Sequence, residues 1–157
     1  MKKLILLAVV GMTMALPALA GNWMFVDIDV TRKHIYLVNT ESAKVTGGVA
    51  EFWYGWVNAD KSLDYDTVIA YYQADCKTYK YQTKDFSMYR RGKKLRSISP
   101  LSSVFKTNED TTLGSTIKAV CQSKYDESLT VSINGPRELG EIGQEAIREI
   151  NKDNLSK

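Results

Sequence analysis

The residues with the most evident chemistry in this sequence are five cations that lie close together. They are Arg90, Arg91, Lys93, Lys94 and Arg96, which fall within seven positions on either side of Gly92. Guanidinium and ammonium groups at this density bind anionic polymers such as glycosaminoglycans or the phosphates of lipopolysaccharide. The alternative is an exposed hairpin that charge keeps soluble and whose lysines prevent edge-to-edge pairing. We expect a protein or an anionic glycan as the partner, and not a nucleic acid.

A second candidate contact surface is aromatic. Its residues are Trp53, Trp56, Tyr79 and Tyr81. Aromatic rings dominate burial, so most rings of this chain are expected in the core. They occur at both parities of their strands, however, and one helix covers only part of one face. Rings that stay exposed would therefore form a surface for a partner or for a second copy of the chain.

Residue types suited to catalysis are scarce. His34 is the only histidine and lies at the expected start of a strand, where a partly exposed sheet residue is its usual role. Asp27 and Asp29 share a face, but no second acid–base partner accompanies them, so a solvated edge is the simpler interpretation. No phosphate-binding loop, nucleotide fingerprint, zinc-protease motif or nucleophile elbow is present. We therefore predict a protein that is not an enzyme, with no catalytic residue, no metal site and no cofactor.

The first 20 residues are typical of a secretory signal peptide. Two lysines precede a short apolar run at residues 4–16, and an A-x-A pattern ends at Ala20. We expect cleavage after Ala20, and the alternative is an uncleaved anchor. No cysteine follows the cleavage point for lipidation, and no later segment is apolar enough to span a membrane. These features predict an exported protein that is periplasmic or secreted.

Cleavage would change the charge of the chain. The leader holds two of the 21 basic residues and none of the 18 acidic ones, which leaves 19 against 18 and a net charge of +1. Any attraction to an anionic partner must then come from a local patch rather than from the overall field. The remaining length suits one domain.

Strands are predicted in the first half of the domain and helices in the second. Runs rich in aromatic and β-branched residues predict strands at 23–30, 33–39 and 49–58 and one long run at 67–85. Residues 86–100 alternate on both sides of Gly92 and predict a hairpin that ends at Pro100. Helical spacing predicts a helix at 108–124, capped by Asn108 and Asp110, a second at 136–154, and a short strand at 128–133 between them.

Two cysteines, Cys76 and Cys121, permit a single disulfide. In the long strand-like run, Cys76 shares a face with the small residues Ala70 and Ala74, which would let a helix approach the sheet closely. Cys121 lies on the apolar face of the first predicted helix, so the two sulfurs would meet if that helix crossed that face. Exported proteins meet oxidising conditions, in which disulfides persist. The alternative is a pair of buried free thiols.

Several short motifs together resemble the surface-adhesin protein E family of exported bacterial proteins. They are "YLVNTES", "VAEFWYGWV", "YQADCKTYKYQ", "MYRRGKKLRSIS" and "AVCQS", which lie between Trp23 and Ser123. The resemblance implies an α+β fold: a curved antiparallel sheet of about six strands, with a helix tethered to one face by the Cys76–Cys121 disulfide. The amphipathic helix at the C-terminus is an addition to that pattern.

Three segments follow from this interpretation. They are a signal peptide at 1–20, an adhesin-E-like α+β domain at 21–124, and an extension at 125–157 that carries the amphipathic helix. We expect a non-enzymatic exported module that contacts proteins or anionic surface polymers through the aromatic sheet face and the basic hairpin. The alternative is a structural or assembly component of the cell envelope, as a homodimer or docked to a partner, with no adhesion role.

Overall fold

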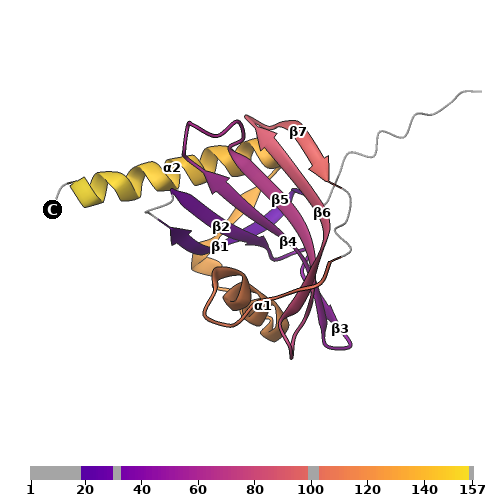
Figure 1. The fold of residues 1–157 in the computed structure, drawn as a ribbon. Helices are drawn as coiled ribbons and strands as arrows, with labels where there is room; N and C mark the ends of the chain where they lie inside the picture. The colour runs from indigo at the N-terminus through magenta and orange to yellow at the C-terminus, as the bar shows by residue number, and fades with distance from the viewer. Residues whose placement is uncertain (1–18, 30–32, 99–102, 156–157) are drawn as a thin grey trace, which may run out of the picture.

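The computed structural model describes residues 19–29, 33–98 and 103–155. The expected signal peptide lies outside these residues apart from its last two positions, as does Pro100 at the expected end of the hairpin. Within them, one open antiparallel sheet carries a helix on each of its faces (Figure 1). The chain therefore has the predicted α+β architecture, with one helix bonded to the sheet by a disulfide and a second helix at the C-terminus.

The described residues form nine strands and two α-helices. The strands are β1 (Gly21–Asp29), β2 (His34–Asn39), β3 (Lys44–Thr46), β4 (Val49–Asn58), β5 (Thr67–Asp75), β6 (Lys80–Arg90), β7 (Lys93–Ile98), β8 (Phe105–Lys106) and β9 (Thr130–Ile133). The helices are α1 (Thr112–Gln122) and α2 (Pro136–Leu155), and a short 3₁₀ turn covers Glu127–Leu129.

The main path of the sheet runs β7-β6-β5-β4-β2-β1-β9, with β3 added beside β4 and β8 beside β6. Every pair in it is antiparallel, as the short links between strands predict. Three of the nine strands, β3, β8 and β9, are only two to four residues long. Without them the sheet has the six strands that were expected.

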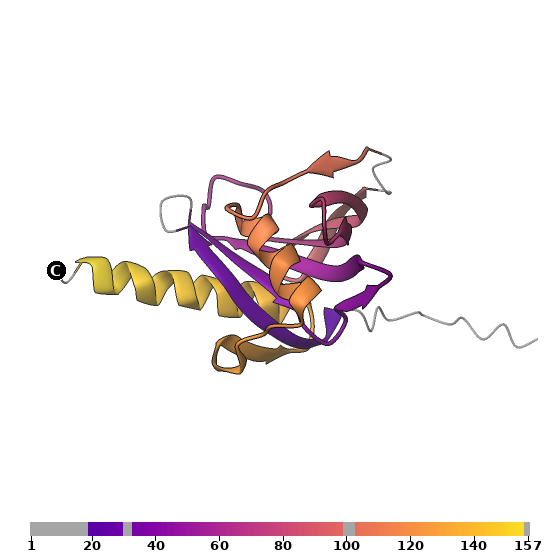
Figure 2. The ribbon, with the colours of Figure 1, turned by 90° about the horizontal axis from the view of Figure 1, so that it is seen from below.

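The helix α1 lies across one face of the sheet, as the view from below shows (Figure 2). Its Ile117 and Val120 are fully buried against Phe52 and Tyr54 of β4. Alternation along β4 and β5 places the aromatic and small residues of one parity under this helix. The disulfide joins Cys76, just beyond β5, to Cys121 in the last turn of α1, with the two Cα atoms 5.8 Å apart.

The helix α2 packs on the opposite face, where Leu139 and Ile147 are buried with Trp23 and Val57. Two glycines of α2, which are poor helix formers, permit this contact. A Cβ added to Gly143 would lie 2.6 Å from Cβ of Val57, and one added to Gly140 would lie 2.7 Å from Oγ1 of Thr67. Small residues in α2 therefore let the helix backbone approach β4 and β5.

The prediction of one long strand at 67–85 is wrong, because the chain reverses directly after β5. The carboxylate of Asp75 causes the turn: its Oδ1 accepts hydrogen bonds from the backbone N–H of Lys77 at 3.0 Å and of Thr78 at 2.7 Å. Tyr79 then adopts a left-handed conformation with φ of 56°. Cys76 thus lies in a hairpin turn at the end of the sheet, but it keeps the predicted face, beside Ala74 and α1.

The prediction that Asn108 and Asp110 cap the first helix is also wrong. The helix begins at Thr112, and the hydroxyl of Thr111 accepts the hydrogen bond from the N–H of Gly114 at 3.0 Å. The carbonyl of Asn108 instead accepts from Thr111, which fixes the entry into the helix. The short strand predicted at 128–133 is present as β9, which pairs with β1.

The turn at Asp75 makes stability depend on pH. Its hydrogen bonds from Thr78 and Lys77 hold the pKa of the carboxyl below its ordinary value. The charged form therefore adds stability above the ordinary pKa near 4, and this stability is lost as pH falls through the lower, folded-state pKa. We expect Asp75→Asn, which keeps an oxygen acceptor but cannot titrate, to lose less stability between pH 6 and pH 3 than the wild type, as measured by urea unfolding. Equal losses in the two proteins would contradict this role.

Candidate functional site

The basic run forms the turn and the outer strand of the β6–β7 hairpin. Arg91 and Gly92 are the two turn residues, with φ of 50° and 79°. Two successive left-handed residues are typical of the type I′ turn that joins two-residue hairpins. The backbone N–H of Arg91 donates to Oδ2 of Asp66 at 2.7 Å. A Cβ added to Gly92 would lie 2.5 Å from Cβ of Arg137, so the turn rests directly on the first turn of α2.

This turn divides the five cations into two groups. Lys93, Lys94 and Arg96 lie on β7, which is the outer strand at one edge of the sheet, and all three are exposed. Arg90 and Arg91 border a pocket instead. In the part of the chain that the structure describes, none of the five forms an ion pair. The structure therefore leaves their charge available to a partner.

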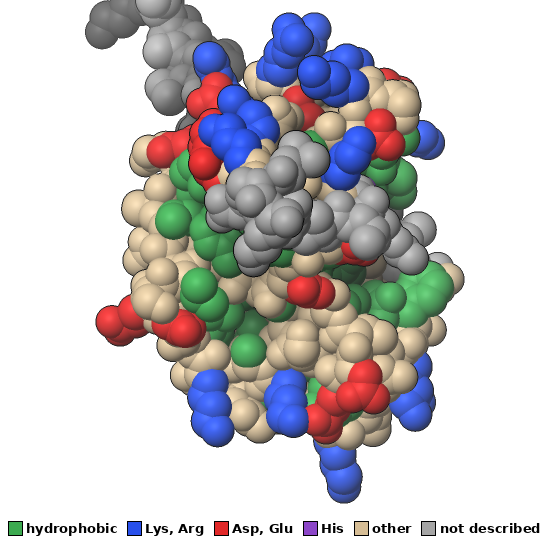
Figure 3. All heavy atoms as spheres, turned by 90° about the vertical axis from the view of Figure 1, so that its left-hand side faces the viewer, with side chains coloured by type: hydrophobic (Ala, Val, Ile, Leu, Met, Phe, Trp, Pro, Cys, Tyr) green, Lys and Arg blue, Asp and Glu red, His purple; other side chains and the backbone are tan. Residues whose placement is uncertain are grey.

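Three acidic residues of α2 form ion pairs within the helix and not with this hairpin. Glu141, Glu145 and Glu149 each pair with a cation of the same helix, at 2.6 to 2.9 Å. On the face drawn in Figure 3, lysine and arginine side chains lie along the upper and lower margins, and hydrophobic patches lie between them. Positive charge on this face is therefore gathered in patches, although the predicted mature chain has a net charge of only +1.

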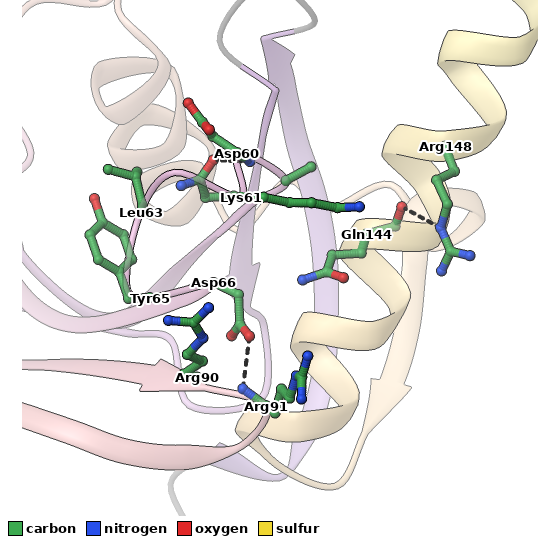
Figure 4. A pocket seen from close by; sticks show the side chains of 11 residues that line it. Asp60, Lys61, Leu63, Tyr65, Asp66, Arg90, Arg91, Gln144 and Arg148 are labelled. Atoms are coloured by element: carbon green, nitrogen blue, oxygen red, sulfur yellow. Dashed lines mark hydrogen bonds between the residues drawn. The ribbon is translucent and has the colours of Figure 1, made fainter.

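A pocket of about 670 Å³ lies between the β4–β5 loop, the β6–β7 turn and α2 (Figure 4). The loop contributes Lys61, Leu63 and Tyr65 to its wall, and the helix contributes Gln144 and Arg148. Arg90 and Arg91 complete the wall from the hairpin, and the pocket therefore brings four cations together from three separate elements. Sequence spacing alone could not show this, because the four cations come from three segments that lie far apart along the chain.

Two carboxylates of the pocket are held by neighbouring donors of their own loop and turn. Asp60 accepts from the backbone N–H of Ser62 at 2.9 Å, and its hydrogen bonds with Ser62 lower the pKa of this carboxyl. Asp66 accepts from the hydroxyl of Thr67 at 3.0 Å, in addition to the N–H of Arg91. Among the described residues neither carboxylate forms an ion pair, so both shape the loop and turn without pairing with the cations of the pocket.

Asn58, at the end of β4, is the buried polar residue of this pocket. Its side chain is 2% exposed, and its Oδ1 accepts from the N–H of Asp60 at 2.8 Å. Its Nδ2 has no hydrogen-bond partner among the residues that the structure describes. A buried donor without a partner costs about 1–3 kcal/mol. No hydrogen bond among the described residues offsets this cost.

A second hollow, of about 450 Å³, lies on the α1 side of the sheet beside the start of α1. Tyr36 and Tyr54 stack in it with ring centroids 6.1 Å apart, and Trp56 continues the row towards Phe86 at 5.8 Å. The hydroxyl of Tyr36 lies 3.4 Å from Nδ1 of His34 at its rim. A row of rings that the helix covers only at one end can receive an apolar or aromatic group of a partner.

The four aromatic residues selected from the sequence are not gathered in one place. Trp56 and Tyr81 lie on the α1 face, where Tyr81 contacts Tyr72 edge-on at 5.5 Å. Tyr79 lies in the turn beside the disulfide and packs on the same face. Trp53 lies on the opposite face, against Tyr71 at 5.0 Å. Of the four, only Trp56 borders the aromatic hollow.

Two tyrosines of the aromatic hollow, Tyr54 and Tyr72, are neutral hydroxyls at physiological pH. Burial raises the pKa of Tyr54 far above its ordinary value, and it raises the pKa of Tyr72 to about 12. Such groups donate and accept hydrogen bonds but do not act as bases near neutral pH.

The residues considered for catalysis have structural contacts. Asp27 accepts hydrogen bonds from the hydroxyl of Thr112 and from the N–H of Ile28, so it links β1 to the start of α1. Over the described ranges, no three His, Cys, Asp or Glu side chains are grouped so that they could hold a metal ion. In the same ranges, no helix is long and apolar enough to cross a membrane.

Comparison with known protein families identifies the family of this chain. The model of the surface-adhesin protein E family matches residues 23–122, which is more than half of the chain. The matched segment begins in β1 and ends at the last residue of α1, and so it includes both cysteines and the basic hairpin. No curated protein and no solved structure matches the chain.

Proposed function

We propose, from the premise that this chain belongs to the surface-adhesin protein E family, that it is an exported, non-enzymatic binding module. Its basic hairpin contacts anionic polymers of a surface, and its aromatic sheet face contacts protein partners. The family supports a binding role with surface partners, and the disulfide fits an exported protein, because such bonds persist in oxidising compartments. The predicted signal peptide supports the same location.

The observation that carries this proposal is the exposed positive charge on the outer strand β7. Lys93, Lys94 and Arg96 are exposed along a sheet edge and have no ion-pair partner among the described residues. Their partners on β6 place Lys94 on the α2 side of the sheet and Lys93 and Arg96 on the α1 side, so the edge carries positive charge on both sides. An anionic chain that lies along this edge gains electrostatic attraction without ordering the protein further.

Binding of the mature protein to immobilised heparin tests this role. We expect Lys93→Ala/Lys94→Ala to weaken binding roughly tenfold near 0.1 M salt, because exposed charge contacts contribute at most about 1 kcal/mol each. The difference should vanish near 1 M salt, where screening is nearly complete. The matched control is Lys77→Ala/Lys124→Ala, which removes the same charge from the disulfide end of the molecule and should leave binding unchanged. Equal losses in both variants, or no saturable binding by the wild type, would contradict the proposal.

An assembly role in the envelope is the second candidate. Val104, just before the short strand β8, and Phe105, the first residue of β8, are exposed by 63% and 44% of their surface. Adjacent exposed apolar side chains favour contact with another protein or a second copy. Light scattering of the mature protein tests this role, with Val104→Ser/Phe105→Ser as the variant. A dimer that this variant dissociates would support assembly, and a monomer at all concentrations would argue against self-association.

A further inference from the structure

The amide of Asn58 is oriented by its own hydrogen bonds. Its backbone N–H donates to the carbonyl of Asp66 at 2.8 Å, and its Oδ1 accepts from the N–H of Asp60 at 2.8 Å. Because Oδ1 must face the N–H of Asp60, the positions of the oxygen and nitrogen in the side-chain amide are fixed. Nδ2 therefore faces away from the N–H of Asp60. Nδ2 is without a partner among the described residues, and Asn58 borders the pocket. A ligand atom that accepts a hydrogen bond would satisfy this donor.

The cations of the pocket favour a ligand whose hydrogen-bond acceptor is negatively charged. Arg90 donates to the carbonyl of Asp64 at 3.3 Å, and Arg148 pairs with Glu145 at 2.8 Å. Lys61 and Arg91 have no side-chain partner among the described residues. Figure 4 shows Lys61 extending across the pocket towards Gln144 of α2. Two unpaired cations from two elements suit a carboxylate, which accepts from several donors at once.

The other walls of the pocket indicate two further features of its ligand. Leu63 and Tyr65 lie together on the loop side and offer an apolar surface (Figure 4). Asp60 and Asp66 offer carboxylate oxygens, which accept from hydroxyl donors. A ligand that meets all of these walls has a carboxylate, several hydroxyls and an apolar face. A carboxylated pyranose has all three, and the pocket volume lies in the range of small-molecule sites.

We propose that this pocket binds one acidic sugar residue of a polymer, with its carboxylate between Lys61, Arg91 and the amide of Asn58. The inference rests on the proposed function and names the chemical group that the module recognises. The exposed cations of β7 then attract the polymer along its length, and the pocket selects the sugar acid within it. Affinity would thus come from the strand and selectivity from the pocket.

Calorimetric titration of the mature protein with glucuronate, glucose, inorganic phosphate and a glutamate dipeptide tests the proposal. We expect saturable binding of glucuronate and at least tenfold weaker binding of the other three. The double variant Lys61→Gln/Arg91→Asn should weaken glucuronate binding at least tenfold, because it removes both unpaired cations. Asparagine suits the left-handed turn position of Arg91, so the hairpin keeps its conformation. The control Lys93→Ala/Lys94→Ala should bind glucuronate as the wild type does.

The outcomes separate this inference from the proposed function. Phosphate binding as tight as glucuronate binding would reduce the pocket to a general oxyanion site and overturn the sugar assignment. Tighter binding of the dipeptide would assign the pocket to peptides and would also overturn it. If heparin binds to the wild type but glucuronate does not, the pocket assignment fails and the role of the hairpin stands. If glucuronate binds and heparin does not, the pocket stands and the polymer role fails.

Discussion

We expect the double substitution Cys76→Ser/Cys121→Ser to lower the free energy of unfolding by about 4 kcal/mol relative to the oxidised wild type. The bond closes a loop of 45 residues, and removing it returns that loop's conformational freedom to the unfolded chain. This loss is a large share of the 5–15 kcal/mol that typical domains have. Equilibrium unfolding in urea, followed by tryptophan fluorescence, measures this loss, and replacing both cysteines leaves no free thiol in the variant.

The matched control for the disulfide is the wild type unfolded with and without a reducing agent. Reduction should lower stability by about the same amount as the double substitution, while the substituted protein should not respond to the reagent. Ile117 and Val120 remain buried in either case, so α1 should keep its helical signal in water. A double variant as stable as the oxidised wild type would show that the tether is dispensable.

The second large effect concerns Gly143 in α2. We expect Gly143→Ala to destabilise the protein by about 1–3 kcal/mol, because the new Cβ would lie 2.6 Å from Cβ of Val57 in a packed core. This outcome opposes the helix propensity of alanine, which alone would stabilise α2 by roughly 1 kcal/mol. Urea unfolding measures the sign of the change directly.

Gly135→Ala is the control for this substitution. A Cβ at Gly135, just before α2, would meet no atom within 4 Å. We expect its effect to stay within about 0.5 kcal/mol, as for surface positions in general. Stabilisation by Gly143→Ala would contradict the close approach of α2 to β4, and with it the role of α2 as part of the core.

Which residues of the central strands lie on which face of the sheet could be predicted. Successive side chains of a strand point to opposite faces, so the position of the strand in the sequence determines both sets. Phe52, Tyr54 and Trp56 lie on one face and Trp53 and Val57 on the other, as their parity predicts. The pairing of Cys76 with Cys121 followed from the same rule and is confirmed. The apolar face of α1 was likewise fixed by its helical spacing.

The turn after β5 could not be predicted from alternation. The run at 67–85 keeps its β-forming character through the turn, and only the hydrogen bonds of Asp75 and the left-handed conformation of Tyr79 reverse it. Aspartate followed by small or polar residues was the available signal. The role of the glycines of α2 could not be predicted either, because helix propensity counts their cost in an isolated helix and not the packing that they permit.

The hairpin that carries the basic run could be predicted, but the pocket beside it could not. The basic run indicated the hairpin, but the division of its cations between the edge strand and the pocket depends on the turn at Arg91 and Gly92. Lys61, Gln144 and Arg148 come from segments far from the run in sequence, and contact between them is set by the packing of α2. No pattern in one sequence indicates such a meeting of a loop, a turn and a helix.

The most direct test of the binding role is to map the contact surface on the isotope-labelled mature protein by NMR, during titration with a heparin oligosaccharide. The proposed function predicts that the amide signals of Arg90–Arg96 on the hairpin shift in a saturable, salt-dependent manner, while those of α1 stay in place. Shifts confined to α1 or β9, or no saturable shift at low salt, would contradict it.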